Sequence, residues 1–518
     1  MRLPCLLIIV LLAQLGMAQN RNTRPNILFC ISDDQSFPHT SAYGTTWVRT
    51  PGFDRVAEDG ILFWRAYTPN AKCAPSRSII LTGRNSWQLE EAANHVPFFP
   101  EKFVTFAETL REHGYRTGYT GKGWAPGNPG MKEGKQRELI GKAYLEHTKT
   151  APARFISTLD YSDNFEAFLD DHDGDAPFFF WYGGLEPHRP YEFQTGFKNA
   201  DKSIDQIDRV FQFWPDNDTV RTDMLDYAYE IEYFDQHLVR MLQLLEDRGE
   251  LDNTIVVVTS DNGMPFPRVK GQTYEASHHM PLAIMWKKGI VNPGRDYDAY
   301  VSFTDLAPTF LEVAGISETE HKMQPMEGRS LVPVFNDQND LHQRTYMVIG
   351  KERHDLGRPD DVGYPVRGIF KDDFLYLINF KPDRWPSGNP ETGYMNTDGS
   401  PTKTFILNEK RAHGSSRYWD WSFGLKSGEE LYNLAEDPDA VINLLEETEG
   451  DYKTVRNALR VILENELRSE GDPRILGQGD VFDKYPYAQD NRNFYNRFMG
   501  GEDVRAGWIN QSDIEKKK

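Results

Sequence analysis

Four short apolar runs, each followed directly by polar residues, constrain the fold of this chain most strongly. They cover residues 25–31, 115–120, 177–182 and 255–258. Helical patterns lie between or beside these runs, at residues 53–58, 104–113 and 222–246. Strands that alternate with helices predict a large, mostly parallel sheet flanked by helices, and such sheets bind ligands beyond the carboxyl ends of their strands. We therefore expect the polar residues after the four runs to meet at one edge of the sheet.

The pattern changes after residue 335. Strand-like runs at residues 345–349, 366–370 and 374–380 are separated by turn-rich segments, which favours an antiparallel sheet. A helix over residues 452–467 is expected to pack on that sheet, because Val455, Leu459, Ile462, Leu463 and Leu467 fall on one of its faces. We therefore predict a domain over residues 24–335 and a smaller α+β domain over residues 336–518, with no assignment of structure after Gly471.

The N-terminal residues have the pattern of a secretory signal. Arg2 precedes an apolar run from Leu3 to Leu15, and small residues suited to cleavage follow, up to Ala18. The run is too short to span a bilayer, and no later stretch is apolar enough to do so. We expect residues 1–18 to be a signal peptide and the protein to be secreted or periplasmic, or lysosomal if it comes from an animal.

The chain has 3 cysteines, and Cys5 lies inside the predicted signal. An exported protein with so few cysteines has no disulfide framework. Cys30 lies within the apolar run 25–31 and is expected to be a small buried hydrophobe. Cys73 is therefore the thiol whose role needs an explanation.

The formal net charge of −20 argues against a general polyanion-binding surface, because long-range repulsion would slow the approach of nucleic acid or of a highly sulfated polymer. An anionic substrate would need a local basic pocket. Candidates for such a pocket are Arg77, Arg84, Lys122, Lys270 and His188.

The stretch from Cys73 to Arg84 reads Cys-Ala-Pro-Ser-Arg-Ser-Ile-Ile-Leu-Thr-Gly-Arg. It resembles the signature of the formylglycine-dependent sulfatases, in which the cysteine is oxidised to an aldehyde. The resemblance extends over residues 24–333 and implies an alkaline phosphatase-like fold, a sulfatase activity and maturation by a formylglycine-generating enzyme. Phosphatases and phosphodiesterases of the same superfamily normally carry Ser or Thr in place of Cys73.

The residues around Cys73 suit such a nucleophile. Pro75 fits the first turn of a helix, so the modified side chain would sit at a helix N-terminus, where the backbone favours an anion such as sulfate. A hydrated aldehyde has a second hydroxyl that can expel sulfate after the first has accepted it. We expect Cys73 to lie at a solvent-facing helix start.

The same resemblance implies a metal site and a set of basic catalytic groups. Its metal ligands would be Asp33, Asp34, Asp261 and Asn262 together with the modified Cys73; four oxygen donors without His suit calcium, with magnesium as a substitute. Lys122 and Lys270 match the lysines that hold the sulfate oxygens, and Arg77 matches the arginine that supports the nucleophile. His188, within Glu-Pro-His-Arg, matches the histidine that protonates the leaving group.

One position departs from the family pattern. Relatives usually read Gly-Lys-x-His, and that histidine assists the release of sulfate, but Trp124 stands here. Another base can substitute, and His39, His278 and His279 are the candidates. Alternatively, Trp124 shapes the substrate pocket or is a packing aromatic.

Within the family, the chain is most similar to the heparan N-sulfatase (sulfamidase) branch. The shared features are the run Ser-Asp-Asn-Gly-Met-Pro-Phe-Pro from Ser260, the context of His188 and the segment from Glu429 to Pro438, the last of which is widespread among sulfatases and discriminates little. The resemblance implies a sulfated saccharide substrate, such as N-sulfated glucosamine, and sugar contacts are expected from Arg353 and His354 unless these are surface charges. An O-sulfatase for another polysaccharide, a phosphoesterase and a noncatalytic glycan-binding relative remain alternatives.

Overall fold

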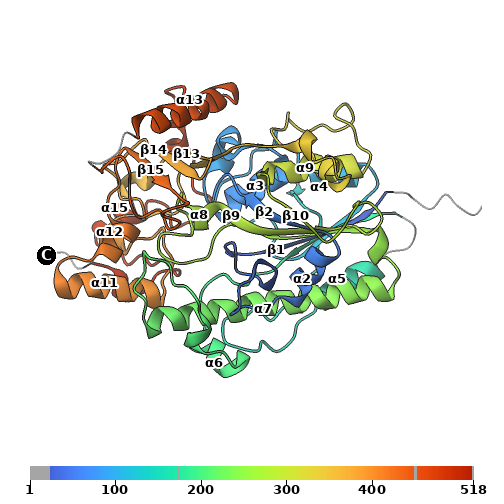
Figure 1. The fold of residues 1–518 in the computed structure, drawn as a ribbon, viewed down its shortest axis with the longest axis horizontal. Helices are drawn as coiled ribbons and strands as arrows, with labels where there is room; N and C mark the ends of the chain where they lie inside the picture. The colour runs from blue at the N-terminus through green and yellow to red at the C-terminus, as the bar shows by residue number, and fades with distance from the viewer. Residues whose placement is uncertain (1–23, 172–175, 448–451, 516–518) are drawn as a thin grey trace, which may run out of the picture.

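The computed structural model describes residues 24–171, 176–447 and 452–515 (Figure 1). The predicted signal peptide, residues 1–18, lies outside the described residues. Within the described ranges, no helix is long and apolar enough to cross a membrane.

A nine-stranded sheet runs through the larger part of the described chain (Figure 1). Its strand order is β10-β2-β9-β8-β1-β7-β3-β6, with β11 paired to β2. Only β9 pairs antiparallel with its neighbours, β2 and β8, so the prediction of a mostly parallel sheet is confirmed. The strands are β1 (Asn26–Ser32), β2 (Ile61–Tyr67), β3 (Arg116–Gly121), β6 (Lys142–Ala143), β7 (Phe178–Gly183), β8 (Thr254–Ser260), β9 (His279–Met285), β10 (Arg295–Tyr297) and β11 (Val301–Ser302).

Helices cover both faces of this sheet. On one face α3 (Cys73–Thr82), α4 (Phe106–Glu112) and α9 (Leu306–Val313) pack against Ile27, Phe29 and Ile31 of β1. On the other face α2 (Pro51–Glu58), α5 (Tyr161–Asp170) and α7 (Asp218–Asp247) pack against the alternate residues Leu28 and Cys30. The two helical layers lie on opposite sides of the sheet in Figure 1. Burial on both faces explains why β1 is a continuous apolar run, and Cys30 is fully buried, as predicted.

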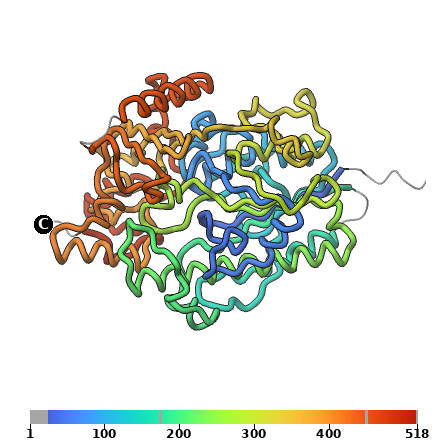
Figure 2. The backbone as a smooth tube through the Cα atoms, viewed as in Figure 1, coloured from blue at the N-terminus to red at the C-terminus, as the bar shows by residue number. Residues whose placement is uncertain are grey.

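A second, antiparallel sheet has the order β12-β13-β14-β15. It consists of β12 (Met347–Lys351), β13 (Val366–Lys371), β14 (Phe374–Asn379) and β15 (Glu429–Asn433). Helix α13 (Lys453–Ser469) packs on it through Leu459, Leu463 and Leu467, as its apolar spacing predicted. The second sheet and α13 lie at one end of the molecule, beside the carboxyl-terminal side of the large sheet (Figure 2). The predicted pairing of a large parallel sheet with a smaller antiparallel one is therefore confirmed.

Short elements complete the described chain. A two-stranded ribbon is formed by β4 (Met131–Lys132) and β5 (Lys135–Gln136). The remaining α-helices are α6 (Thr195–Ala200), α8 (Glu275–His278), α10 (Val332–Phe335), α11 (Pro401–His413), α12 (Arg417–Phe423), α14 (Val481–Lys484) and α15 (Phe494–Met499). The last two lie in the segment after Gly471, for which the sequence predicted no structure.

Candidate active site

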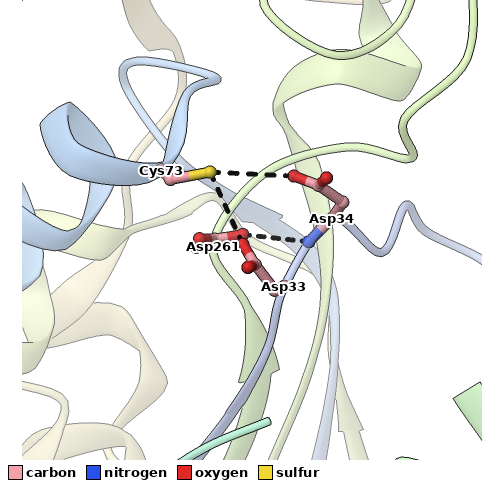
Figure 3. A group of neighbouring side chains, drawn as sticks. All are labelled: Asp33, Asp34, Cys73 and Asp261. Carbon is pink, nitrogen blue, oxygen red and sulfur yellow. Dashed lines mark hydrogen bonds between the residues drawn. The ribbon is translucent and has the colours of Figure 1, made fainter. Parts of the chain in front are cut away.

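The register of the central strands brings the polar residues after them together. Ser32 at the end of β1 pairs with Ser260 at the end of β8, so Asp33 and Asp261 follow at neighbouring positions. The backbone N–H of Asp34 donates a hydrogen bond of 3.1 Å to Asp261 Oδ1. Figure 3 shows the three carboxylates gathered around Cys73. The predicted convergence at one edge of the sheet is therefore observed.

Cys73 is the first residue of helix α3, and its thiol faces the carboxylates. Its Sγ lies 3.5 Å from Asp33 Oδ1 and 3.9 Å from Asp34 Oδ1. The expectation of a solvent-facing position is wrong, because the residue is only 1% exposed. Burial raises the pKa of the Cys73 thiol well above its usual range, and the neighbouring carboxylates act in the same direction, while Lys122 opposes them.

Arg77 follows one turn later on α3 and is fully buried. Its Nε donates to Asp261 Oδ2 at 2.8 Å, and its Nη1 donates to the backbone carbonyls of Lys122 and Gly123 at 2.7 and 2.8 Å. One guanidinium therefore ties the helix that carries Cys73 to a carboxylate of the site and to the loop that carries Lys122. This placement agrees with a supporting role for Arg77.

Two glycines allow Lys122 to reach the site. A Cβ on Gly183 would lie 1.8 Å from the Lys122 carbonyl oxygen, and one on Gly121, whose φ is +72°, would lie 2.0 Å from the Gly183 carbonyl oxygen. The ends of β3 and β7 therefore approach too closely for any side chain. From this position Lys122 Nζ bonds Asp33 Oδ1 and Oδ2 at 2.9 and 2.6 Å.

Lys270 enters from the loop after β8. Its Nζ lies 2.6 Å from Asp34 Oδ2 and 2.8 Å from Asp398 Oδ2. Burial opposes the charge on Lys270, but Asp34 and Asp398 hold its pKa well above the usual range. Asp398 is itself buried, and it precedes helix α11, far along the chain from the other site residues.

The carboxylates respond differently to burial. Burial disfavours the ionised form of Asp33, but Lys122, His188, Arg77 and Lys270 together hold its pKa well below its usual range. For Asp261 burial dominates and raises the pKa to about 7, with Asp33 and Asp34 adding to the rise and Arg77 opposing it. Additional positive charge among these carboxylates would favour their ionised forms.

The donor set fits a hard divalent cation. One ligand atom from each of Asp33, Asp34, Cys73 and Asp261 can lie within 4.8 Å of the others. Asn262, the predicted fourth oxygen ligand, donates its amide N–H to Asp34 Oδ1 at 2.7 Å. Its Oδ1 is buried without a hydrogen-bond partner among the described residues. A buried orphan oxygen beside three carboxylates is the chemistry that calcium or magnesium coordination satisfies.

His188 lies in the loop after β7, with its ring beside Asp34. Its Nδ1–H donates to the carbonyl of Arg189 at 2.6 Å, which leaves Nε2 3.8 Å from Asp34 Oδ2. About a third of the side chain is exposed, at 34%. His188 also forms a group with Asp34 and Asp398, with one ligand atom of each inside 4.8 Å. The ring therefore borders both the buried carboxylates and solvent.

Trp124 packs on the helix of Cys73. Its indole Nε1–H donates to Ser78 Oγ at 2.8 Å, and its ring lies edge-on to Phe99 with centroids 5.2 Å apart. The ring also borders the core cluster that contains α3 and α4. Of the three roles considered, this geometry favours a packing aromatic.

The three alternative bases are engaged elsewhere. His39 bonds the Tyr227 hydroxyl at 3.1 Å, and burial lowers its pKa to about 3. His278 bonds the Thr68 carbonyl at 2.7 Å, and burial lowers its pKa to about 4. His279 bonds Glu275 and the carbonyl of Trp64. The histidine that the structure places beside the carboxylates is instead His188.

Three further candidates bond groups outside the carboxylate cluster. Arg353 is 2% exposed and donates to the carbonyls of Tyr485 and Pro486 in the C-terminal segment. His354 is fully buried between the Gly271 carbonyl and Asn70 Oδ1, beneath the loop of Lys270. Because both residues are buried, the alternative that they are surface charges is wrong, and neither is exposed to a ligand. Helix α3 begins at Cys73 and ends at the left-handed cap residue Gly83, so Arg84 follows the opposite end of the helix. Arg84 donates to the Pro325 carbonyl.

Sequence reasoning did not identify Asp398. Its surroundings, Asn-Thr-Asp-Gly-Ser-Pro, are typical of a turn before a helix, and nothing in that pattern indicates a partner such as Lys270. Phe155 and Glu230 were also not predicted, although both line a cleft with Asp33, Lys122 and His188.

Known proteins resemble this chain in sequence and fold. It is 26% identical to an ulvan-active sulfatase of Formosa agariphila, over 91% of this chain and 85% of that protein. It is 27% identical to the human (Homo sapiens) N-sulphoglucosamine sulphohydrolase, over 84% of this chain and 88% of that protein. A solved structure of a protein in complex with its substrate D-glucosamine-2-N,6-O-disulfate shares the fold, with a TM-score of 0.59 and 22% identity, covering 87% of this chain and 98% of that one.

The Sulfatase family model matches residues 25–316, which is more than half of the chain. This span contains Cys73, Arg77, Lys122, His188 and Lys270, whereas Asp398 lies beyond it. The chain is therefore a member of the sulfatase family, with an alkaline phosphatase-like fold.

Proposed function

We propose that this enzyme removes sulfate from a sulfated carbohydrate, with Cys73 as the precursor of its formylglycine nucleophile. The observation that carries the proposal is the convergence, in a member of the sulfatase family, of Cys73 with carboxylates and basic side chains at one sheet edge. The same cluster supports one calcium ion, or magnesium in its place, held by Asp33, Asp34, Asp261, Asn262 and the modified Cys73.

When present, the hydrated aldehyde supplies a hydroxyl nucleophile, and the ion supplies positive charge beside the sulfate oxygens. The side chains of this protein then have distinct roles. Arg77 holds the helix of Cys73 against Asp261. Lys122 and Lys270, which bond Asp33 and Asp34, offer their ammonium groups to the sulfate oxygens. His188 donates a proton from Nε2 to the leaving atom, the nitrogen of an N-sulfate or the oxygen of an O-sulfate, while the Arg189 carbonyl fixes its ring through Nδ1.

The substrate class is a sulfated glycan. The human relative is named for N-sulphoglucosamine and the bacterial relative for ulvan, and the two are similarly distant at 27% and 26% identity. The motif likeness to the sulfamidase branch favours the N-sulfate of glucosamine in heparan-type glycans. An O-sulfatase for another sulfated polysaccharide is the second candidate, and the ulvan-active relative favours it.

A panel of substrates tests this proposal. Purified enzyme with formylglycine would be incubated with glucosamine 2-N-sulfate, N-acetylglucosamine 6-sulfate, ulvan fragments and an aryl phosphate, and released anions would be quantified by ion chromatography. Sulfate release from at least one sugar, without comparable phosphate release, is expected. Phosphate release alone would replace the proposal with a phosphoesterase activity, and binding without any release would indicate a glycan-binding relative.

Maturation requires a formylglycine-generating enzyme as a transient partner. The predicted signal peptide, residues 1–18, would direct the chain to a secreted, periplasmic or lysosomal location. Expression with and without the formylglycine-generating enzyme, with the mass of the Cys73 peptide as readout, tests the requirement for this partner. N-terminal sequencing of the exported protein tests the signal peptide.

A further inference from the structure

A cleft of about 260 Å³ opens beside His188, on the solvent side of the buried carboxylates. It is bounded by the loop that carries Phe155, the loop after β7 and helix α7. Its lining residues are Asp33, Lys122, Phe155, Ser157, Leu185, Glu186, His188, Arg189 and Glu230. The cleft therefore begins at the proposed sulfate site and extends past the proposed acid, in the direction that a leaving group must take.

Phe155 presents an aromatic ring at the mouth of this cleft. The side chain is 49% exposed, although burial of such a ring is strongly favourable. Its φ of +79° is left-handed, a conformation that is costly for a bulky residue and that clusters at functional sites. Hydrogen bonds from the Arg154 N–H to Glu192 and from the Ser157 N–H to Glu186 fix the backbone on both sides. The backbone that carries the ring is therefore held in place on both sides of Phe155.

Glu230 supplies a polar group deeper in the cleft. It lies on α7, is 2% exposed, and its Oε1 has no hydrogen-bond partner within the described part of the chain. A buried carboxyl without a partner is unfavourable, and most such groups in folded proteins are satisfied. Burial raises the pKa of Glu230 well above its usual range, with Glu186 and Asp226 adding to the effect, so a protonated carboxyl is available to donate.

The geometry points to this cleft as the subsite for the sugar ring that carries the scissile sulfate, with Phe155 packing against the C–H face of the ring and Glu230 hydrogen-bonding one of its hydroxyl groups. The assignment rests on the proposed function, since His188 marks the side on which the sugar leaves. A cleft of about 260 Å³ is small beside the roughly 300–1,000 Å³ typical of ligand sites, so it takes one ring rather than a longer chain. Leu185, which is 39% exposed, adds a second apolar side chain to the lining of the cleft.

Matched variants test the subsite. Phe155→Ala removes the ring, and Phe405→Ala is its control, because Phe405 on α11 is also exposed but does not line the cleft. Glu230→Gln keeps a hydrogen-bonding group of the same shape, whereas Glu230→Met keeps only the shape. Binding of glucosamine 2-N-sulfate and N-acetylglucosamine 6-sulfate would be measured by calorimetry on the full chain carrying Cys73→Ser, and KM on the matured enzyme.

Phe155→Ala and Glu230→Met should each weaken sugar binding and raise KM by about tenfold. Glu230→Gln should change both by less than about threefold, and Phe405→Ala should change neither. Inhibition by inorganic sulfate should stay unchanged in all four variants, because Lys122 and Lys270, the residues proposed to hold the sulfate oxygens, are intact.

The outcomes separate the two proposals. If the matured enzyme releases sulfate but Phe155→Ala and Glu230→Met keep the parental KM, the subsite is wrong and the function stands. If both variants weaken sugar binding but the parent releases no sulfate, the subsite stands and the function is wrong. If inhibition by inorganic sulfate weakens as much as sugar binding does, the variants disturb the whole site, and this result also overturns the subsite. If the parent binds neither sugar, the subsite is wrong for these rings, and the function falls with it only if no substrate of the panel, ulvan fragments included, releases sulfate.

Discussion

Asp398 connects two groups of the active site that lie far apart in the sequence. The buried carboxylate accepts a bond of 2.8 Å from the buried Lys270, and it also approaches His188, which is partly exposed. Lys270 is thus shared between Asp34, a proposed metal ligand, and Asp398, which lies outside the family segment 25–316. The second carboxylate fixes where the ammonium group stands before substrate arrives.

Asp398→Asn keeps the shape of the side chain but removes the charge that faces Lys270. We expect kcat/KM to fall by about tenfold and the free energy of unfolding to fall by about 1–3 kcal/mol, because a buried charge-assisted bond is weakened. Steady-state kinetics and urea unfolding would measure the two effects, with the exposed Asp383→Asn as control. Parental kcat/KM in Asp398→Asn would show that Lys270 needs no second carboxylate.

Trp124 allows the packing role and the missing-base role to be separated. Trp124→His shortens the side chain and removes its contact with Phe99, so a packing role predicts a loss of about 1–3 kcal/mol of stability. Steady-state turnover should then be no faster than in the parent. Thermal unfolding and sulfate release would be compared in both proteins. Faster turnover in Trp124→His would restore the view that a base is missing at this position.

The motif residues could be predicted from sequence because their chemistry depends on fixed local spacing. Cys73 and Arg77 lie one turn apart on a helix, and Lys122 directly follows a strand. The exposure of Cys73 could not be predicted, because it is set by segments distant in sequence that close over the helix start. Asp398, Glu230 and Phe155 have no local pattern, since their positions follow from tertiary packing alone.

At the scale of elements, helix α13 is joined to the segment that follows α3. Glu470, just beyond α13, accepts hydrogen bonds from the Trp87 indole at 2.6 Å and from Asn85 at 2.8 Å. Burial raises its pKa to about 8, and Glu327 and Glu466 add to the rise. A carboxyl at this junction is therefore protonated in the folded protein over a pH range in which it is ionised in the unfolded chain.

This contact predicts a pH dependence of stability. The pKa of Glu470 is higher in the folded state than in the unfolded chain. Its contribution to the free energy of unfolding is therefore complete below about pH 4.5 and is lost as pH rises toward 8. Glu470→Gln should remove this loss, which is on the order of 3 kcal/mol between pH 5 and pH 8. Urea unfolding of both proteins at the two pH values measures it. If the free energy of unfolding of Glu470→Gln depends on pH as steeply as that of the parent, other groups cause the dependence.

Strand and helix positions were largely predictable, because β1, β7 and β8 are apolar runs and α7 has a long helical period. The antiparallel insertion of β9 was not predicted, since it depends on pairing with β2 and β8 rather than on its own sequence. The segment between Gly471 and residue 515 forms only short helices, such as α14 and α15, which contain too few residues to show a period. Contacts with distant residues such as Arg353 hold it in place.

At the scale of the whole molecule, the proposed ion should link the site to global stability. Asp33 and Asp34 follow β1 and Asp261 follows β8, so a bound ion crosslinks the centre of the sheet to helix α3 through Cys73. The division at residues 335 and 336 stays a prediction. Bonds such as Lys270 to Asp398 and Trp87 to Glu470 cross it, so both parts of the chain contribute to the site and its support.

Calcium should therefore stabilise the folded protein by about 2.7 kcal/mol at a hundredfold excess over its Kd. Thermal unfolding of chelator-treated protein, titrated with calcium and then with magnesium, would show the shift. Asp261→Ala should abolish it, whereas Asp383→Asn should retain it. An unchanged midpoint in the parent, or full activity after chelation, would contradict the metal site.

The central claim, that Cys73 is the precursor of the nucleophile of a sulfatase, is tested most directly by following its modification and activity together. The enzyme would be expressed with increasing amounts of a formylglycine-generating enzyme, and the fraction of Cys73 peptide carrying formylglycine would be measured by mass spectrometry. We predict that sulfate release rises in proportion to that fraction and is absent in Cys73→Ala, which retains the parental circular dichroism spectrum. Equal sulfate release by protein with wholly unmodified Cys73 would contradict the account.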